Sequence, residues 1–231
     1  MLPILILRPE PGAGETARRA AGLGLAVVTI PLFRVAPLPW SVPDPAQHDA
    51  LLLTSANAVR HAGSGLAALA ALPAYAVGAA TARAAEAAGL PIAGTGQRGA
   101  QALVDTMTSC GLRRILWLAG EERSAMNSGA AQITAISCYA ADAIADPRGW
   151  AKAVAGPAVL LAHSARAAQR AAALAGPARA HLCLAAISPA AAAAGGDGWA
   201  TVAAAALPTD TDLLALAAKL CQSRDEKPHR E

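Results

Sequence analysis

The stretch DALLLTSANAVR, residues 49–60, decides the fold, because the chain carries a second version of it, PAVLLAHSARAA, at residues 157–168. The two align with Ser55 opposite Ser164. In each, a short apolar run precedes a polar turn and an alanine-rich stretch, the pattern of a buried strand that leads into a helix. We therefore expect one βα unit to occur twice.

Two further matches lie at nearly the same offset along the chain. Residues 75–83 resemble residues 185–193, and residues 102–104 lie opposite residues 212–214, so the three matches are 109 or 110 residues apart. Alanine-rich sequence can match itself by chance, but a shared offset argues against chance and indicates a repeated unit. The repeat predicts two similar α/β domains.

A fourth match reverses the order of the segments. Residues 115–118 come last in the first copy, yet their counterpart is residues 4–7, near the N-terminus. The second copy is therefore expected to be a circular permutant of the first, completed by the N-terminal segment. The predicted parts are an inserted α/β lobe at 49–136, a discontinuous α/β lobe at 1–31 plus 147–222, interdomain linkers at 32–48 and 137–146, and a flexible tail at 223–231.

Short apolar runs alternate with helical stretches along the whole chain, as in βα units on a parallel sheet. Alanine inflates the hydrophobic fraction of 55%, and aromatic residues are only 3%, so small aliphatic side chains must form the core. The expected strands are 4–7, 26–30, 50–53, 74–77, 115–118, 133–136, 158–162, 182–187 and 201–205.

Charge and hydropathy exclude several classes of partner. The formal net charge is +3, and the arginines are scattered singly, without the basic stripe of a nucleic-acid-binding surface. The apolar start is shorter than the core of a signal peptide, and no apolar run approaches the ~20 residues of a membrane span. We expect a soluble cytoplasmic protein, and the weakly basic charge is compatible with an acidic small molecule as its ligand.

The four cysteines, Cys110, Cys138, Cys183 and Cys221, do not have metal-ligand spacing, and disulfides are rare in cytoplasmic proteins. We interpret them as buried or incidental thiols. His, Cys and carboxylate residues form no cluster in the sequence, so no metal is expected.

Candidate site residues follow the strands, because parallel sheets bind ligands beyond the carboxyl ends of their strands. Helices begin there, and their free N–H groups and positive dipole ends suit carboxylates. The serines and threonine among these residues can also be helix N-caps, which is compatible with ligand binding. The candidates are Arg8, Thr54, Ser55, Asn57, Gly78, Thr81, Arg98, Ser164, Arg166 and Ser188.

Two other motifs suggest rival chemistry. Residues 94–99, GTGQRG, match the dinucleotide-binding pattern, with Glu121 downstream, and favour an NAD-dependent oxidoreductase. The preceding strand would be only residues 91–93, however, and the glycines are not repeated in the second copy. His163 and Ser164 suggest a hydrolase, but the strained turn that such serines need is missing from the sequence pattern.

Tyr139 follows the strand expected at 133–136, where the chain crosses between domains. A phenol there can donate a hydrogen bond to a leaving group. Packing against the linker is the other interpretation.

Taken in order, these features resemble the uroporphyrinogen-III synthase (HemD) family. The resemblance rests on Arg8-Pro9, Thr16-Ala17, the segment 54–59, the segment 77–82 with Gly89, Gly120, Tyr139, the segment 163–167, the segment 186–188, and Leu213-Leu214. It implies two flavodoxin-like α/β lobes joined by a two-stranded linker. The N-terminal strand and helix would belong to the lobe that holds the C-terminal half.

The resemblance also implies an activity. Such an enzyme is a cofactor-free hydro-lyase and a cytoplasmic monomer of tetrapyrrole and heme biosynthesis, which cyclises hydroxymethylbilane with loss of water and inversion of ring D. The substrate would lie in the cleft between the lobes, delivered by transient contact with porphobilinogen deaminase. A non-catalytic bilobal ligand-binding protein is the alternative from another class.

Residue roles carry over by position. Tyr139 matches a tyrosine that assists loss of the hydroxyl, and Thr81 a threonine that faces the cleft. Backbone amides near Ser55, Ser164 and Ser188 would hold the acetate and propionate groups. Arg8, Arg166 and Arg98 would neutralise carboxylates. Ala190 and Ala191 stand where relatives often carry threonine, which puts a hydroxyl from that side in doubt.

Overall fold

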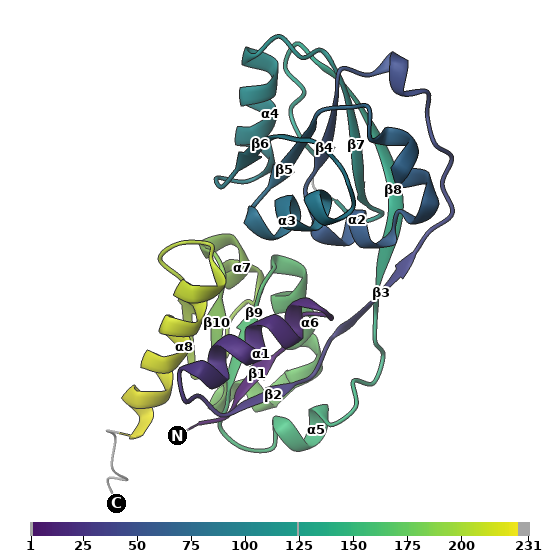
Figure 1. Cartoon of the computed structure of the whole chain (residues 1–231). Helices are drawn as coiled ribbons and strands as arrows, with labels where there is room; N and C mark the ends of the chain where they lie inside the picture. Colours follow the sequence, from purple (N-terminus) through teal and green to yellow (C-terminus); the bar gives the residue numbers. More distant parts are fainter. Residues whose placement is uncertain (1, 124, 226–231) are drawn as a thin grey trace, which may run out of the picture. The chain divides into compact units, whose positions relative to one another are not determined.

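The computed structural model describes residues 2–123 and 125–225, which form two compact units (Figure 1). Unit 1 comprises Met1–Arg34 and Ala143–Glu231, and unit 2 comprises Val35–Asp142. The two boundaries fall inside the ranges expected as linkers, 32–48 and 137–146. Unit 1 is thus built from two stretches that are separated by the whole of unit 2.

Unit 1 contains a five-stranded parallel sheet in the order β11-β10-β9-β1-β2. The N-terminal strand β1 lies inside this sheet, with Leu5 opposite Val28 on one side and Leu160 on the other. The strands are β1 (Ile4–Ile6), β2 (Val27–Thr29), β9 (Val159–Ala162), β10 (Cys183–Ala186) and β11 (Thr201–Ala204).

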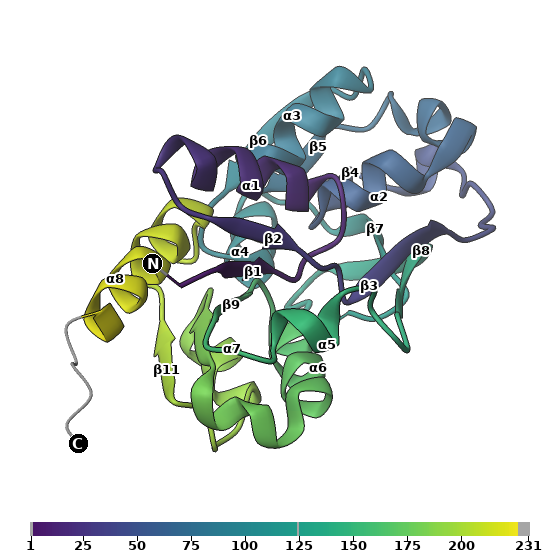
Figure 2. The ribbon, with the colours of Figure 1, turned by 90° about the horizontal axis from the view of Figure 1, so that it is seen from below.

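Helices cover both faces of this sheet (Figure 2). On one face α1 (Gly12–Gly22) and α8 (Asp210–Asp225) pack on Ile4, Ile6 and Leu161. On the other face lie α6 (Ala165–Ala175) and α7 (Pro189–Ala194), with α5 (Trp150–Ala153) and η3 (Gly176–His181) beside them. The buried side chains of α6 are all alanines, which allow close approach to the strands.

Unit 2 contains a six-stranded sheet in the order β3-β8-β7-β4-β5-β6. Its central strand β4 is fully buried, and Leu51 and Leu53 face one side while Leu52 faces the other. The strands are β3 (Phe33–Pro37), β4 (Ala50–Leu53), β5 (Ala74–Val77), β6 (Ile92–Gly96), β7 (Arg114–Gly120) and β8 (Gln132–Ala143).

Unit 2 is layered in the same way. On the Leu51 face lie α2 (Ala56–His61), η2 (Gly63–Leu69) and α3 (Ala79–Ala87), and on the Leu52 face lies α4 (Ala100–Ser109). The short helix η1 (Pro45–Gln47) precedes β4. Both cores are aliphatic, with Trp117 as a large exception on the α4 face.

The predicted α/β class with parallel sheets is confirmed, and each expected strand is present. β8 is longer than expected and continues through most of the range assigned to the second linker. Strand β3 was not predicted as a strand, and β6 extends beyond the short strand expected at 91–93. Helix α8 reaches residue 225, inside the range expected as a tail, and residues 226–231 lie outside the described residues.

The states of the cysteines and the lengths of the helices bear on two interpretations of the sequence. Cys138, Cys183 and Cys221 are buried free thiols, whereas Cys110 is exposed. Among the helices of the described residues, none is long and apolar enough to cross a bilayer.

Candidate active site

The three predicted serines are helix N-caps, each directly beyond the end of a buried strand. A serine hydroxyl that accepts a backbone N–H satisfies one of the free donors of the first turn and leaves others for a ligand. The bonds join Ser55 Oγ to Asn57 N (3.1 Å, α2), Ser164 Oγ to Ala167 N (3.1 Å, α6) and Ser188 Oγ to Ala191 N (3.2 Å, α7). The capping role is thus confirmed for all three.

Gly78 and Thr81 lie where β5 passes into α3. Gly78 has a φ of 79°, which favours glycine, and it is the N-cap residue of the helix. Thr81 follows in the first turn and is only 5% exposed. Its N–H bonds to the Gly78 carbonyl at 3.1 Å, so Gly78 rather than Thr81 caps this helix.

Thr54, at the end of β4, contacts the neighbouring strand β7. Its Oγ1 accepts a hydrogen bond from Trp117 Nε1 at 3.0 Å. The Arg123 guanidinium lies 5.7 Å from the centre of the Trp117 indole and donates to Ser137 Oγ at 2.7 Å. Arg123 is a cation at this end of the sheet that was not among the predicted site residues.

Tyr139 lies within the long strand β8 rather than after a short one. Its ring packs against the core on the α2 and α3 face, and it is partly buried. The centre of the ring is 6.3 Å from that of His61, at an angle of 35°. Burial lowers the pKa of His61, with a smaller effect from Arg60, so neutral imidazole faces the phenol ring.

The predicted arginines lie in different surroundings. Arg8 follows β1, and its side chain covers the start of α1, where a β-carbon on Gly12 would be 2.5 Å from Arg8 Nε. The Arg166 guanidinium lies over Phe33, 4.4 Å from the ring centre. Arg98 is exposed in the turn between β6 and α4.

A partly buried polar network in unit 1 was not predicted. The Asp210 carboxylate, at the start of α8, accepts hydrogen bonds from Thr16 Oγ1 (2.9 Å) and from Arg19 Nη1 (2.5 Å). His163 Nε2 lies 2.9 Å from the same carboxylate, and Arg8 Nη1 lies 3.9 Å from it. The network therefore connects α1, the end of β9 and α8.

The network has a definite charge state. Burial alone would raise the pKa of Asp210, but hydrogen bonds from His163, Arg19 and Thr16 hold it well below its usual range. Burial lowers the pKa of His163 despite the carboxylate. His163 Nδ1 is buried without a hydrogen-bond partner, and the interactions with Asp210 and the Leu161 backbone raise the pKa of His163 less than burial lowers it. We infer a neutral His163 that donates from Nε2 to an ionised Asp210.

The structure brings most, but not all, of the candidates together within each unit. In unit 1, Arg8, Ser164 and Ser188 follow the adjacent strands β1, β9 and β10. In unit 2, the loops after β4 and β5 are neighbours, β7 adjoins β4 on the other side, and β8 lies beyond β7. Arg98 follows the edge strand β6, which is separated from β8 by β5, β4 and β7, so Arg98 lies apart from Tyr139.

Packing explains the glycines of residues 94–99. A β-carbon on Gly94 would be 2.8 Å from the Tyr75 ring, and one on Gly96 would be 3.1 Å from Leu103 Cβ. Gly99, with a φ of 93°, is the N-cap residue of α4. These glycines belong to an edge strand and its turn, whereas a dinucleotide fold needs a central strand there.

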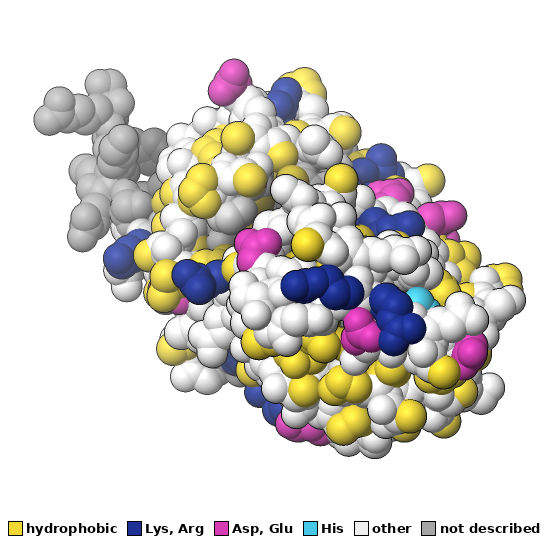
Figure 3. All heavy atoms as spheres, turned by 90° about the horizontal axis from the view of Figure 1, so that it is seen from above, with side chains coloured by type: hydrophobic (Ala, Val, Ile, Leu, Met, Phe, Trp, Pro, Cys, Tyr) yellow, Lys and Arg dark blue, Asp and Glu magenta, His cyan; other side chains and the backbone are white. Residues whose placement is uncertain are grey.

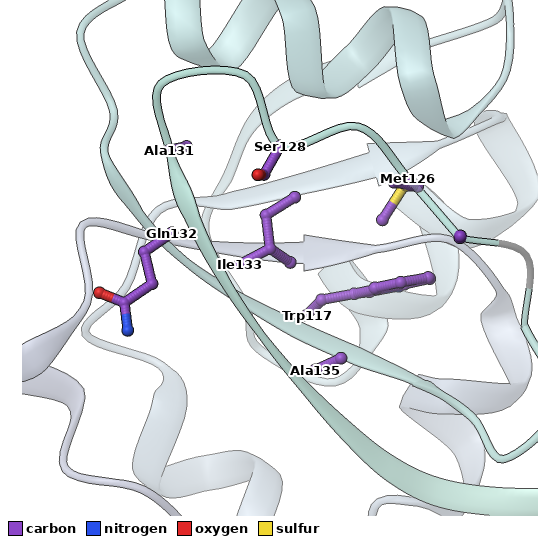
Figure 4. A pocket seen from close by; sticks show the side chains of 8 residues that line it. Trp117, Met126, Ser128, Ala131, Gln132, Ile133 and Ala135 are labelled. Atoms are coloured by element: carbon purple, nitrogen blue, oxygen red, sulfur yellow. The ribbon is translucent and has the colours of Figure 1, made fainter.

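A pocket of about 570 Å³ lies on the α4 face of unit 2 (Figure 4). Trp117, Ile133 and Ala135 extend into it from β7 and β8, opposite Met126 and Ser128 of the connecting loop. The described residues that line it carry no ionisable side chain. Such a lining does not suit a polyanion.

Basic side chains are dispersed on the face shown in Figure 3, with acidic side chains between them. This agrees with the scattered arginines of the sequence. Among the described residues, no group of three or more His, Cys, Asp or Glu side chains could hold a metal ion.

A family model identifies the family of this chain, and solved structures share its fold. Residues 14–215 match the family model described as Uroporphyrinogen-III synthase HemD. The uroporphyrinogen-III synthetase structure of Helicobacter pylori 26695 has a TM-score of 0.63 and 18% identity, covering 95% of this chain and 100% of that one. A mutant uroporphyrinogen III synthase from the extremely thermophilic bacterium Thermus thermophilus has a TM-score of 0.56 and 15% identity, covering 96% and 100%. The search of curated protein sequences found no match.

Proposed function

Since the chain belongs to the uroporphyrinogen-III synthase HemD family, we propose that it carries out the family reaction with the residues described above. The chain is a lyase of porphyrin and heme biosynthesis, which converts hydroxymethylbilane into uroporphyrinogen III. The observation that carries this conclusion is the family match over residues 14–215, which include parts of both units.

The reaction removes the terminal hydroxyl as water and closes the ring with ring D reversed. Attack at the substituted carbon of ring D gives a spiro intermediate, which reopens before the final closure. Tyr139 donates a hydrogen bond to the departing hydroxyl, because a phenol can be a donor at neutral pH. The selectivity for the isomer with ring D reversed comes mostly from holding the two ends of the bilane close together.

Helix starts in both units bind the acetate and propionate groups. The capped turns at Ser55, Ser164 and Ser188 support this assignment, because their remaining N–H groups favour anions. Thr54, Asn57, Gly78 and Thr81 complete the set in unit 2, and Arg8, Arg166 and Arg98 add positive charge.

The two units are permuted copies of one flavodoxin-like lobe. Unit 1 has the order β11-β10-β9-β1-β2, and unit 2 has β6-β5-β4-β7-β8 before the edge strand β3. Strands β9, β10 and β11 then correspond to β4, β5 and β6, and β1 and β2 correspond to β7 and β8. Strand β3 and the part of β8 from residue 137 onward form the two-stranded linker, and the lobes are 1–31 plus 147–222 and 49–136.

The protein acts as a cytoplasmic monomer and receives its substrate by transient contact with porphobilinogen deaminase. The family resemblance supports this proposal. Light scattering of the purified chain tests the monomer, and a change of mass on mixing the two proteins tests the contact.

The activity is tested by supplying porphobilinogen deaminase and porphobilinogen with and without the protein. Chromatography of the oxidised products should show uroporphyrin III in its presence and uroporphyrin I in its absence. An unchanged isomer ratio would contradict the proposed activity.

A further inference from the structure

A β-bulge lies next to Tyr139. Strands β7 and β8 pair residue by residue until Ala119 meets Ser137, but Gly120 then pairs with Tyr139, which leaves Cys138 as an extra residue. A bulge changes the direction of the side chains that follow it and is common beside active sites. Because of the extra residue, Cys138 and Tyr139 both pack on the α2 and α3 face.

Hydrogen bonds hold the bulge in place. The buried Cys138 Sγ lies 3.5 Å from the Ala58 carbonyl and 3.6 Å from the Ala119 carbonyl. Beyond the bulge, Glu121 N donates to the Tyr139 carbonyl at 2.8 Å. The backbone on both sides of Tyr139 is therefore fixed.

Gly120 provides the space for the phenol. A β-carbon at this position would lie 2.9 Å from Tyr139 Cζ and 3.0 Å from its hydroxyl oxygen. Gly120 does not have a positive φ, so its backbone conformation alone does not require glycine. The missing side chain matters because it leaves room for the hydroxyl end of Tyr139.

We propose that Gly120, together with the bulge at Cys138, positions the Tyr139 hydroxyl for the reaction. This inference rests on the proposed role of Tyr139. Alanine at 120 displaces the free end of the tyrosine ring, because a side chain that rotates about two bonds yields more easily than a paired strand does. The displacement moves the hydroxyl while it leaves the substrate carboxylate sites unchanged.

Gly94 offers a matched control in the same sheet. A β-carbon there would lie 2.8 Å from the Tyr75 ring, so Gly94→Ala makes the same kind of clash with a tyrosine that we assign no role in the reaction. The control separates the effect of a crowded sheet from the effect of a displaced catalytic phenol.

The experiment is a double-mutant cycle on kcat with hydroxymethylbilane, measured for Gly120→Ala, Tyr139→Phe, the double variant and Gly94→Ala. We expect Gly120→Ala to lower kcat by about tenfold to a hundredfold, with KM nearly unchanged. In the Tyr139→Phe background the same change should lower kcat by less than about threefold. Gly94→Ala should keep a wild-type kcat even where it lowers the melting temperature.

Equal losses from Gly120→Ala in both backgrounds, or equal losses in Gly94→Ala, would overturn the inference. A wild-type kcat in Tyr139→Phe would overturn both the inference about Gly120 and the proposed role of Tyr139. The proposed activity would still stand in that case, provided that the wild-type protein forms isomer III. If Gly120→Ala does not fold, Cys138→Ala loosens the bulge and enters the same cycle. Cys138→Ala should lower kcat several-fold when Tyr139 is present and have little effect in the Tyr139→Phe background. An equal loss of kcat in both backgrounds would refute the proposal.

Discussion

Replacement of Asp210 by asparagine tests the network that connects α1 with α8. The carboxylate accepts hydrogen bonds from Thr16 and Arg19, lies 2.9 Å from His163 Nε2, and its side chain is only 14% exposed. Asparagine keeps one oxygen and the size of the side chain but removes the charge. Arg19 then loses its anionic partner, and His163 faces a neutral amide.

The expected loss is about 2–4 kcal/mol in the free energy of unfolding of unit 1. Hydrogen bonds to a charged group contribute about 1.5–3 kcal/mol each, and the amide oxygen retains part of this. For a chain of this size such a loss corresponds to a melting temperature lower by roughly 5–15 °C.

Asp212→Asn is the control, because Asp212 stands in the same first turn of α8 and accepts a hydrogen bond from the Thr209 hydroxyl. Removing this more exposed charge should lower stability by no more than about 1 kcal/mol. Urea denaturation measures both variants, and amide hydrogen exchange should rise in α1 and α8 but not in α4 for Asp210→Asn. Equal losses in the two variants would refute the network argument.

The pH dependence follows from the two pKa shifts. Asp210 has a folded pKa below its unfolded value, so its stabilisation is complete above about pH 4 and is lost as the pH falls further. Burial lowers the pKa of His163, so the unfolded chain takes up a proton first and stability declines below about pH 6.5. The difference between wild type and Asp210→Asn should therefore narrow below pH 4. A difference that stays constant to pH 2 would contradict this assignment.

Three further outcomes are expected. Tyr139→Phe should slow turnover without abolishing isomer III formation, and a wild-type rate would reduce Tyr139 to a packing role. Thr54→Val leaves the Trp117 indole N–H without its acceptor and should lower the free energy of unfolding by about 1–2 kcal/mol, whereas Thr54→Ser should keep the wild-type value. Equal stability of the two variants in urea would argue against this hydrogen bond. Hydrogen bonds from the backbone N–H of residue 113 and from Arg114 lower the pKa of Asp49 to about 2. A carboxyl NMR titration of Asp49 with a midpoint near 4 would contradict that geometry.

Sequence reasoning missed strand β3 and predicted only a short strand, 91–93, at the position of β6, and both are edge strands of unit 2. Buried central strands such as β4 appear in the sequence as apolar runs, because both of their faces are covered. The amino-acid composition of an edge strand is less constrained than that of a central strand. An edge strand therefore tolerates the proline at the end of β3 and the glycines of β6. The extension of β8 was missed because Ser137 interrupts the apolar run that ends at Ile136, and the alanine-rich residues that follow up to Asp142 also fit a connector.

The capped turns could be predicted, whereas the Asp210 network could not. Ser188 directly follows an apolar run, and Ser55 and Ser164 follow one after a single polar residue, so a local rule finds all three. Thr16, His163 and Asp210 belong to three distant segments that meet because α1 and α8 pack on the same face of unit 1. No sequence spacing relates them, and only the fold reveals the contact.

The place of β1 has a consequence for the order in which the protein is made. During synthesis β1, α1 and β2 emerge before unit 2, but β1 pairs with β9, whose residues are 159–162. Unit 2 is complete on the nascent chain by residue 142 and can fold by itself, as domains generally do. The apolar residues Ile4–Leu7 therefore remain unpaired on that side until the ribosome has passed residue 162, and for this interval they are a natural target for a chaperone.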